Sequence, residues 1–339
     1  MRKYRAASLL EPGKIEIIEK EISPLEPGDV LIRIKACGIC TLEKRLYTGA
    51  MKIFYPIVGG HEASGVVEES RSNALKPGDR VVLDLLNRCG ECRFCRSGQS
   101  NHCINQFKGK AGVLGGFSEY IVLPSKEVYK IDEKVPFNEA TLTEPLSDCI
   151  HSCMQAGLSP ENTVFVMGAG TMGLLHLLIL KKYGIRSIIS DLDEKKLETA
   201  KDCGADFIIN AGNEDVSKKI KEITGGMGCN VIFVTTPGKA PLKQAFDLVS
   251  IKGCICIYAA NYPAIELCID PNIIHYKEIK ITGTESKTEK DFFKAVGFQN
   301  SRSMNFSPLI SATFKLNEIN DAIKASLDPS TYRVIIEME

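Results

Sequence analysis

Four cysteines, Cys89, Cys92, Cys95 and Cys103, lie within one short stretch of this 339-residue chain. Gaps of two residues let a loop fold its thiolates onto one centre, as a tetrahedral Zn²⁺ site with four sulfur ligands requires. Disulfides are the first alternative, but no signal peptide is recognisable and the other nine cysteines are scattered through apolar runs. An iron–sulfur cluster uses similar spacing, and a nucleic-acid-binding zinc ribbon would need a small domain with basic surroundings. We predict a closed structural zinc site.

Two other motifs contain residue types that bind metals. The segment "ACGIC", which ends a predicted strand, contains Cys37 and Cys40, and "GGHE" places His61 beside Glu62 at the start of another strand. A thiolate, an imidazole and carboxylates suit a catalytic zinc, which keeps one position open for water or substrate. Each residue alone is more often structural than functional. Together they indicate a second metal site.

A glycine-rich motif, "GAGTMG", lies between a predicted strand and a predicted helix. Gly168, Gly170 and Gly173 have the G-x-G-x-x-G spacing, and Thr171 and Met172 stand between the last two glycines. Such glycines let the backbone approach a pyrophosphate at the helix N-terminus. We predict that these five residues bind a dinucleotide.

An acidic residue, Asp191, ends the next predicted strand. A carboxylate there accepts hydrogen bonds from both ribose hydroxyls and repels the 2′-phosphate of NADP, so NAD is the predicted cofactor. Asp193, two residues on, is the less favoured candidate. The structural alternative is that these glycines and aspartates serve only turns and helix starts.

The pattern of apolar residues changes along the chain. Short alternating segments separated by Pro-Gly pairs predict strands up to about Tyr129. From Glu144 onward, helical segments alternate with apolar strands such as "NTVFVMG", "RSIISD" and "CNVIFV", which predicts an α/β fold with a parallel sheet covered by helices on both faces. After about Glu285, two helical segments precede a final strand, "YRVIIEM".

Composition narrows the function classes. The chain is 44% hydrophobic and 25% charged, with a formal net charge of zero, as expected for a two-domain globular protein. The balanced charge argues against nucleic-acid and membrane-surface partners. No apolar stretch reaches the roughly 18 residues of a membrane span. Reduced thiols and the lack of a targeting signal predict a cytoplasmic location.

Taken together, these motifs resemble the zinc-dependent medium-chain alcohol dehydrogenases. "GHEASG" is similar to the family's zinc signature, the four cysteines have its C-x2-C-x2-C-x7-C form, and "GGFSEY", "TEPLSDCIHSC" and "GAGTMG" follow in the expected order. The acidic segment "TEPLS" resembles the sorbitol and threonine dehydrogenase branch, where Glu144 takes the position of the third protein ligand.

The resemblance implies a fold and an activity. It implies a GroES-like β-barrel catalytic domain, residues 1–147 and 284–339, and a Rossmann domain, residues 148–283, that binds NAD. The expected reaction is reversible hydride transfer between NAD and an alcohol whose pKa is lowered by Zn²⁺. Zinc-free quinone or enoyl reductases share the fold but lack both ligand sets. A non-catalytic NAD-binding protein is the remaining alternative.

The family's ligand positions can be assigned residue by residue. Cys40 and His61 are expected to bind the catalytic zinc, with Glu62 or Glu144 completing the protein ligands, and the two carboxylates are expected to exchange with water during turnover. Cys37 matches no ligand position. The sequence does not decide which carboxylate is bound at rest.

One segment departs from the family pattern. Many relatives continue "GIC" as G-[ST]-D-x-H and relay the alcohol's proton through the hydroxyl and the histidine. Here Leu42, Glu43 and Arg45 take the hydroxyl, acid and histidine positions, and neither leucine nor guanidinium shuttles a proton near neutrality. Thr41, Thr48, or a ligand carboxylate with water are the alternatives. Arg45 is either an anion-binding residue or an ordinary surface residue.

The substrate expectation rests on the acidic ligand set. A secondary alcohol in a polyol, sugar or amino acid is favoured, because a neighbouring hydroxyl or amine can chelate zinc beside the reacting oxygen. Simple and phosphorylated alcohols or ketones remain alternatives. A homodimer or homotetramer is expected, with "GCICIYAAN" as a candidate for edge-to-edge pairing.

Overall fold

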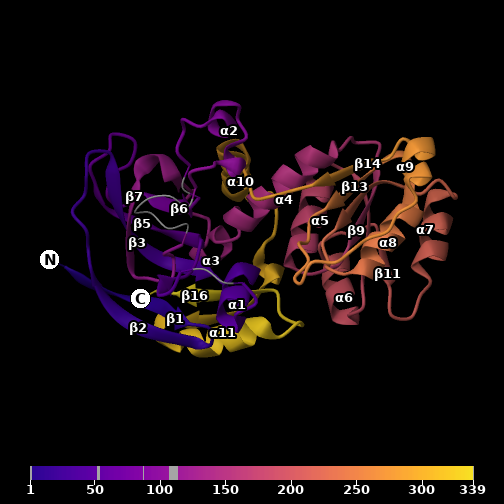
Figure 1. Ribbon diagram of the computed structural model, residues 1–339. Helices are drawn as coiled ribbons and strands as arrows, with labels where there is room; N and C mark the ends of the chain where they lie inside the picture. Colours follow the sequence, from indigo (N-terminus) through magenta and orange to yellow (C-terminus); the bar gives the residue numbers. More distant parts are fainter. Residues whose placement is uncertain (1, 52–53, 87, 107–113, 339) are drawn as a thin grey trace. The chain divides into compact units, whose positions relative to one another are not determined.

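The computed structural model describes residues 2–51, 54–86, 88–106 and 114–338 (Figure 1). The chain divides into two compact units. The first consists of Met1–Ser147 together with Lys287–Glu339, and the second of Asp148–Ser286. The tail therefore returns to the first unit at Lys287, three residues after the predicted position 284.

The first unit is built on two sheets. A three-stranded antiparallel sheet has the order β2-β1-β4, and a seven-stranded sheet has the order β15-β16-β3-β5-β6-β8, with β7 pairing to β3. The strands are β1 (Lys3–Glu11), β2 (Lys14–Glu21), β3 (Asp29–Gly38), β4 (Ile57–Val58), β5 (Glu62–Ser70), β6 (Arg80–Asp84), β7 (Tyr120–Pro124), β8 (Val128–Lys130), β15 (Ile310–Lys315) and β16 (Arg333–Glu337).

The strand register brings distant polar residues together. β3 is almost wholly buried and pairs with three strands, which places it at the centre of the sheet. Its last residue, Gly38, lies opposite Glu62, and Glu62 lies opposite Asp84 on β6. Paired residues on antiparallel strands lie within about 5.5 Å at Cα. Charged side chains therefore gather where β3 ends and β5 begins.

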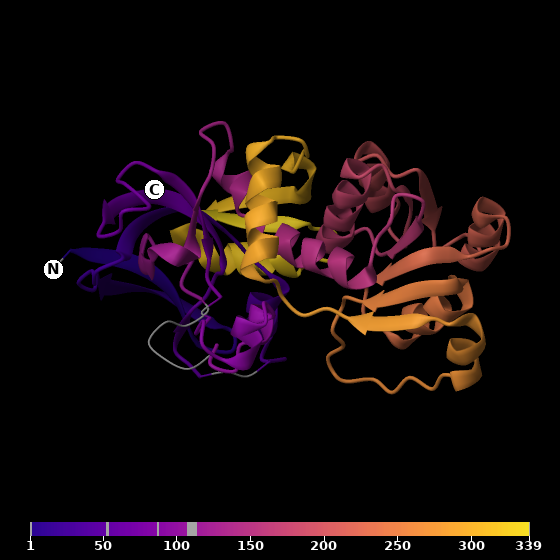
Figure 2. The same cartoon turned by 90° about the horizontal axis from the view of Figure 1, so that it is seen from above.

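Helices complete the first unit. They are α1 (Thr41–Thr48), α2 (Arg93–Arg96), α3 (Phe137–Ala140), the start of α4 (Thr143–Ala156), α10 (Glu289–Asn300) and α11 (Ile319–Leu327), with single 3₁₀ turns at Ser100–His102, Ser125–Glu127, Ser307–Leu309 and Leu316–Glu318. The gold helix α10 in Figure 2 packs on β6 and β8 through Phe292 and Val296, which are buried.

Helix α1 interrupts a region for which the sequence predicted only strands. Cys40 is its N-cap residue, and the carboxylate of Glu43, in the first turn, accepts a hydrogen bond from the Cys40 backbone amide. Gly49 ends the helix in the left-handed conformation, with φ of 74°. This reciprocal cap starts a helix immediately after β3, although cysteine is not among the usual capping residues.

The second unit contains a six-stranded, wholly parallel sheet with the order β11-β10-β9-β12-β13-β14. Its strands are β9 (Thr163–Met167), β10 (Arg186–Asp191), β11 (Phe207–Asn210), β12 (Cys229–Val234), β13 (Val249–Ile257) and β14 (Lys280–Gly283), and its helices are α5 (Thr171–Lys182), α6 (Glu194–Asp202), α7 (Val216–Thr224), α8 (Lys239–Leu248) and α9 (Pro271–Lys277).

The strand order of this sheet reverses at β9, its first strand. Successive strands proceed outward on one side through β10 and β11, and then on the other side through β12, β13 and β14. Right-handed crossovers in opposite directions place helices on opposite faces. This arrangement confirms the predicted α/β fold with a doubly wound parallel sheet.

The expected edge pairing of "GCICIYAAN" is not compatible with this sheet. β13 contains most of that segment, and its residues Cys254–Ile257 pair with β12 on one side and with β14 on the other. Both sets of backbone groups are therefore used within the chain. The outer strand is β14, whose polar sequence, KITG, carries a weak strand signal.

Candidate metal and cofactor sites

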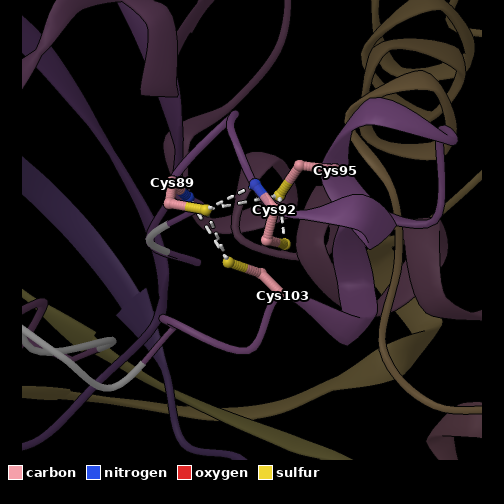
Figure 3. A group of neighbouring side chains, drawn as sticks. All are labelled: Cys89, Cys92, Cys95 and Cys103. Atoms are coloured by element: carbon pink, nitrogen blue, oxygen red, sulfur yellow. Dashed lines mark hydrogen bonds between the residues drawn. The ribbon is translucent and has the colours of Figure 1, made fainter.

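The four clustered cysteines lie close together in the first unit. Figure 3 shows their sulfur atoms pointing toward one another. The Sγ atoms of Cys89 and Cys103 are 3.5 Å apart, those of Cys92 and Cys95 are 3.6 Å apart, and those of Cys89 and Cys95 are 4.0 Å apart. Four sulfurs at the usual Zn–S length of about 2.3 Å from one ion are about 3.8 Å apart. The cluster therefore fits a tetrahedral metal site.

The disulfide alternative is wrong. Bonded sulfurs lie about 2.05 Å apart, far closer than any of these pairs, and all thirteen cysteines are free thiols. Hydrogen bonds from the backbone amides of Cys92 and Glu91 lower the pKa of the Cys89 thiol to about 6. This shift favours the thiolate, the form that binds a metal, whereas burial raises the pKa of the Cys95 thiol to about 12.

Cys40, His61 and Glu62 form a second group in the same unit. Their donor atoms, one from each residue, all lie within 4.8 Å of one another. Cys40 follows β3, His61 precedes β5, and Glu62 is the first residue of β5, so the β3–β5 register brings them together. Cys37 is wholly buried on β3, where burial raises the pKa of its thiol.

Glu43 is a site residue that the sequence analysis did not recognise. Its carboxylate lies 2.9 Å from His61 Nδ1 and accepts hydrogen bonds from the backbone amides of Cys40 and Gly60. Burial alone lowers the pKa of His61, but the Glu43 charge and hydrogen bonds to Cys40 and Glu43 raise it well above its usual value. Glu43 thus orients the imidazole as outer-shell carboxylates do. Its place in the first turn after Cys40 was the available signal.

The Glu62 carboxylate is fully buried and faces the guanidinium of Arg333, which begins β16. The ion pair is 2.9 Å long, and Arg333 also donates a hydrogen bond to the carbonyl of Ile39. Within the described residues, neither oxygen of Glu62 accepts a hydrogen bond. Burial raises the pKa of this carboxyl, although Arg333 opposes the shift. A buried carboxylate with open lone pairs is suited to binding a cation.

Gly38 has no side chain, which leaves space for the Glu62 carboxylate. A Cβ atom at Gly38 would lie 2.2 Å from Glu62 Oε2. Any larger residue at the end of β3 would displace the carboxylate from the metal group. Glycine is therefore required here by close approach.

Glu144 lies in the first turn of α4 and forms a short, buried ion pair with Lys287. It is not among the described residues whose donor atoms group with Cys40 and His61. Desolvation lowers the pKa of Lys287 to about 8, with Arg88 adding to that shift and Cys40 opposing it. Neither Lys287 nor Arg333 lies in a sequence motif that signals a role at this site.

The charges of this region fit a divalent cation. Two buried cations face four groups that are negative in a metal-bound site, which leaves a deficit of two positive charges. The cations are Lys287 and Arg333, and the four anionic groups are Cys40, Glu43, Glu62 and Glu144. Buried charges require partners, so a Zn²⁺ ion would complete the balance.

The segment that departs from the family pattern forms α1. Leu42 packs against the hydrophobic core, Thr41 is exposed, and Thr48 donates its hydroxyl to the Lys44 carbonyl of its own helix. Arg45 is half-buried.

The glycine-rich turn of the second unit has the expected geometry. Gly168 has a φ of 111°, and Gly170 is the N-cap residue of α5. A Cβ atom at Gly173 would lie 1.9 Å from the Gly168 carbonyl oxygen, whereas a Cβ atom at Gly170 would meet nothing within 4 Å. Gly173 therefore packs the helix against the turn, and Gly170 leaves an open approach to the N-terminus of α5. Thr171 and Met172 form its first turn.

Asp191 stands at the end of β10 beside this turn. Its carboxylate accepts hydrogen bonds from the backbone amides of Ala169, Leu192 and Asp193 at 2.7 to 3.1 Å. The side chain of Asp193 instead accepts from the amides of Lys195 and Lys196 and so caps α6. Of the two aspartates, Asp191 is the one that contacts the glycine-rich turn.

Comparisons with known proteins show which family this chain resembles over nearly its whole length. Residues 26–133 match the model of the alcohol dehydrogenase GroES-like domain, and residues 171–301 match that of the zinc-binding dehydrogenase. The chain is 31% identical to an uncharacterized zinc-type alcohol dehydrogenase-like protein of Haemophilus influenzae, with 97% of each chain covered. It is 30% identical to a sorbitol dehydrogenase of Bacillus subtilis, over 95% of this chain and 93% of the relative.

A solved structure shows the same fold. It is that of an Escherichia coli CFT073 protein described as a short chain alcohol dehydrogenase complexed with NADH, with a TM-score of 0.89, 28% identity and 99% of both chains covered. The chain therefore belongs to the zinc-dependent medium-chain dehydrogenase family. Membership confirms the expected GroES-like and Rossmann fold classes and the enzyme class, a zinc- and NAD-dependent alcohol dehydrogenase.

Proposed function

We propose that this protein reversibly oxidises a secondary alcohol of the polyol, sugar or amino-alcohol type, with NAD as the hydride acceptor. The observation that supports the proposal most strongly is the grouping of Cys40, His61 and Glu62 within 4.8 Å, with the Glu62 carboxylate fully buried. The sorbitol dehydrogenase relative supports the polyol class. The zinc-free reductase alternative is disfavoured because both sets of metal-binding residues are present.

In this proposal, Cys40, His61 and Glu62 hold the catalytic zinc, and Cys89, Cys92, Cys95 and Cys103 hold the structural zinc. Bound zinc lowers the pKa of an alcohol and polarises a carbonyl.

The remaining tasks in this proposal belong to the chain's own residues. Glu43 orients His61, and Arg333 neutralises and positions Glu62. Leu42 and Arg45 leave the usual proton relay unfilled, so a carboxylate with water is the proposed proton acceptor.

The cofactor part of the proposal assigns the pyrophosphate to the turn at Gly168, Gly170 and Gly173 with Thr171 and Met172, and the adenosine ribose to Asp191. An Asp191→Ser variant is expected to lose kcat/KM with NAD and to gain it relatively with NADP. Asp193→Ser is the matched control, because serine can still cap α6 and the proposed ribose contact of Asp191 is kept.

The decisive test measures NADH formation by absorbance against polyols, threonine, sugar phosphates and simple secondary alcohols. We expect turnover on one class with vicinal hydroxyl or amino groups, inhibition by a chelator, and loss of turnover in Cys40→Ser and His61→Ala. Cys203→Ser, a half-buried thiol of the second unit, is the control and should retain activity. Turnover that survives Cys40→Ser would contradict the proposed metal role.

The cellular compartment and the oligomeric state of the enzyme are also proposals. Thirteen free thiols support the cytoplasm as its compartment. None of the helices in the described ranges is both long enough and apolar enough to cross a bilayer. A homodimer or homotetramer is proposed from the resemblance, and sedimentation analysis would decide between them.

A further inference from the structure

The backbone of Lys287 is fixed by the helix that follows it and by a hydrogen bond from Arg88. It directly precedes α10, whose N-cap residue, Thr288, shares a reciprocal cap with Asp291. The Lys287 carbonyl accepts a hydrogen bond of 3.0 Å from Arg88, which is itself 2% exposed and bound to Asp84 at 2.6 Å. The backbone of Lys287 is thus fixed both by the following helix and by a buried ion pair.

The side chain of Lys287 binds Glu144. The ammonium group contacts the Glu144 carboxylate, and the two residues are 4% and 5% exposed. Oppositely charged groups that are removed from water attract each other much more strongly than an exposed pair does. Removing one partner leaves an unpaired buried charge, so the arrangement is strongly maintained.

The two acidic candidates for the third ligand position therefore have different partners. Glu62 is held by the guanidinium of Arg333 but has one carboxylate oxygen grouped with Cys40 and His61. Glu144 has its charge satisfied by Lys287 and, in the described chain, lies outside that group. The difference between them lies in the cation that each one binds.

We propose that Lys287 is a positioning residue that sets the resting ligand set of the catalytic metal. By binding Glu144, its ammonium group keeps that carboxylate out of the coordination shell, so that Cys40, His61 and Glu62 are the protein ligands at rest. This inference rests on the proposed metal role of the Cys40 group. It concerns the ligand set and does not depend on which alcohol is the substrate.

The test uses the full chain loaded with cobalt(II), whose visible absorption reports coordination number. An identically loaded Cys40→Ser variant is subtracted to remove the contribution of the four-cysteine site. We expect Lys287→Met to lose visible intensity, because release of Glu144 adds a ligand and five-coordinate cobalt absorbs more weakly than tetrahedral cobalt. Lys287→Arg, which keeps the charge, should retain the wild-type spectrum.

Two further variants keep the inference testable if Lys287→Met folds poorly. Glu144→Gln alone should leave the spectrum unchanged, and Lys287→Met combined with Glu144→Gln should restore it. Lys290→Met, an exposed lysine three residues further on, is the matched control and should have no effect. A changed spectrum in Glu144→Gln, or a wild-type spectrum in a folded Lys287→Met, overturns the inference.

The outcomes separate this inference from the proposed function. A wild-type protein with no Cys40-dependent cobalt absorption refutes both. A Cys40-dependent spectrum that is insensitive to Lys287 refutes only the role of Lys287. The expected spectra without turnover on any alcohol support the role of Lys287 and refute the proposed reaction.

Discussion

The Glu43 carboxylate makes three contacts around the candidate catalytic metal site. It lies beside the His61 ring and accepts hydrogen bonds from the backbone amides of Cys40 and Gly60. It is 4% exposed, and the charge and hydrogen bond of His61 hold its carboxyl pKa below the usual value despite burial. An ionised carboxylate in this position fixes both the tautomer and the orientation of the imidazole.

We expect Glu43→Gln to lower the zinc affinity of the Cys40 group by about 10- to 100-fold, as loss of an outer-shell carboxylate does elsewhere. Competition with a fluorescent chelator measures this affinity. Glu69→Gln, an exposed change on β5, is the control and should leave it unchanged. An unaltered affinity in Glu43→Gln would show that the imidazole is oriented without the carboxylate.

Two glycines in the turn between β9 and α5 differ in the space that surrounds them. A methyl group at Gly173 collides with the backbone of Gly168, whereas one at Gly170 enters open space in front of α5. Gly170 has a φ of −74°, which alanine adopts without strain.

We therefore expect Gly173→Ala to lower the stability of the second unit by several kcal/mol through overpacking, on the order seen for misfit core substitutions. Gly170→Ala should change stability by only about 1 kcal/mol and should still weaken NAD binding, because the methyl group occupies the approach of the phosphates. Thermal unfolding and calorimetric NAD titration separate the two effects. Normal NAD affinity in Gly170→Ala would rule out a pyrophosphate at this turn.

A second feature at the scale of elements is the pH response of the network around Arg88. Desolvation and the nearby charge of Asp84 raise the pKa of Glu127 to about 7, although Arg88 opposes the shift. The folded state then binds more protons than the unfolded state between about pH 4.5 and 7. The stability from this group is complete below pH 4.5 and is lost as the pH rises through 7.

Denaturant unfolding at pH 5 and pH 8 tests this expectation. In the wild type, the Glu127 carboxyl should lower the free energy of unfolding of the first unit by at most about 3 kcal/mol between pH 5 and pH 8. Glu127→Gln should not show this decrease. Glu133→Gln, an exposed change nearby, should keep the wild-type pH dependence. If the difference between pH 5 and pH 8 were the same in Glu127→Gln and wild type, Glu127 would not be the responsible group.

The whole molecule contains two separate candidate metal sites, one at the four cysteines and one at Cys40, so its zinc content can be predicted. Elemental analysis should find about two zinc ions per chain, and about one in either Cys103→Ser or Cys40→Ser. The Cys103→Ser variant should also unfold at a lower temperature, because a closed structural site contributes to folding. A brown chain containing iron would instead favour the iron–sulfur alternative for the four cysteines.

Much of the architecture could be predicted from local signals. The segments "RSIISD" and "EKDFFKAVGFQN" coincide with β10 and α10, because apolar periodicity and helix caps act over a few residues. α1 was not predicted, since its cap pairs Cys40 with Glu43 and cysteine is an unusual cap. The four cysteines and the glycine-rich turn were recognisable because their spacing within a single loop is itself the geometric requirement.

The sequence by itself determined the α/β class, the glycine-rich turn and the residues able to bind metals. The tertiary structure was needed to show which cation pairs with which carboxylate: Lys287 binds Glu144 across 143 positions, and Arg333 binds Glu62 across 271. The physical reason is that periodicity and spacing report contacts between near neighbours in the chain, whereas the pairing of buried charges depends on strand register and on how the tail packs. The motifs that contain Glu62 and Glu144 therefore leave both carboxylates as candidate ligands, and the fold distinguishes them by giving each a different cation as partner.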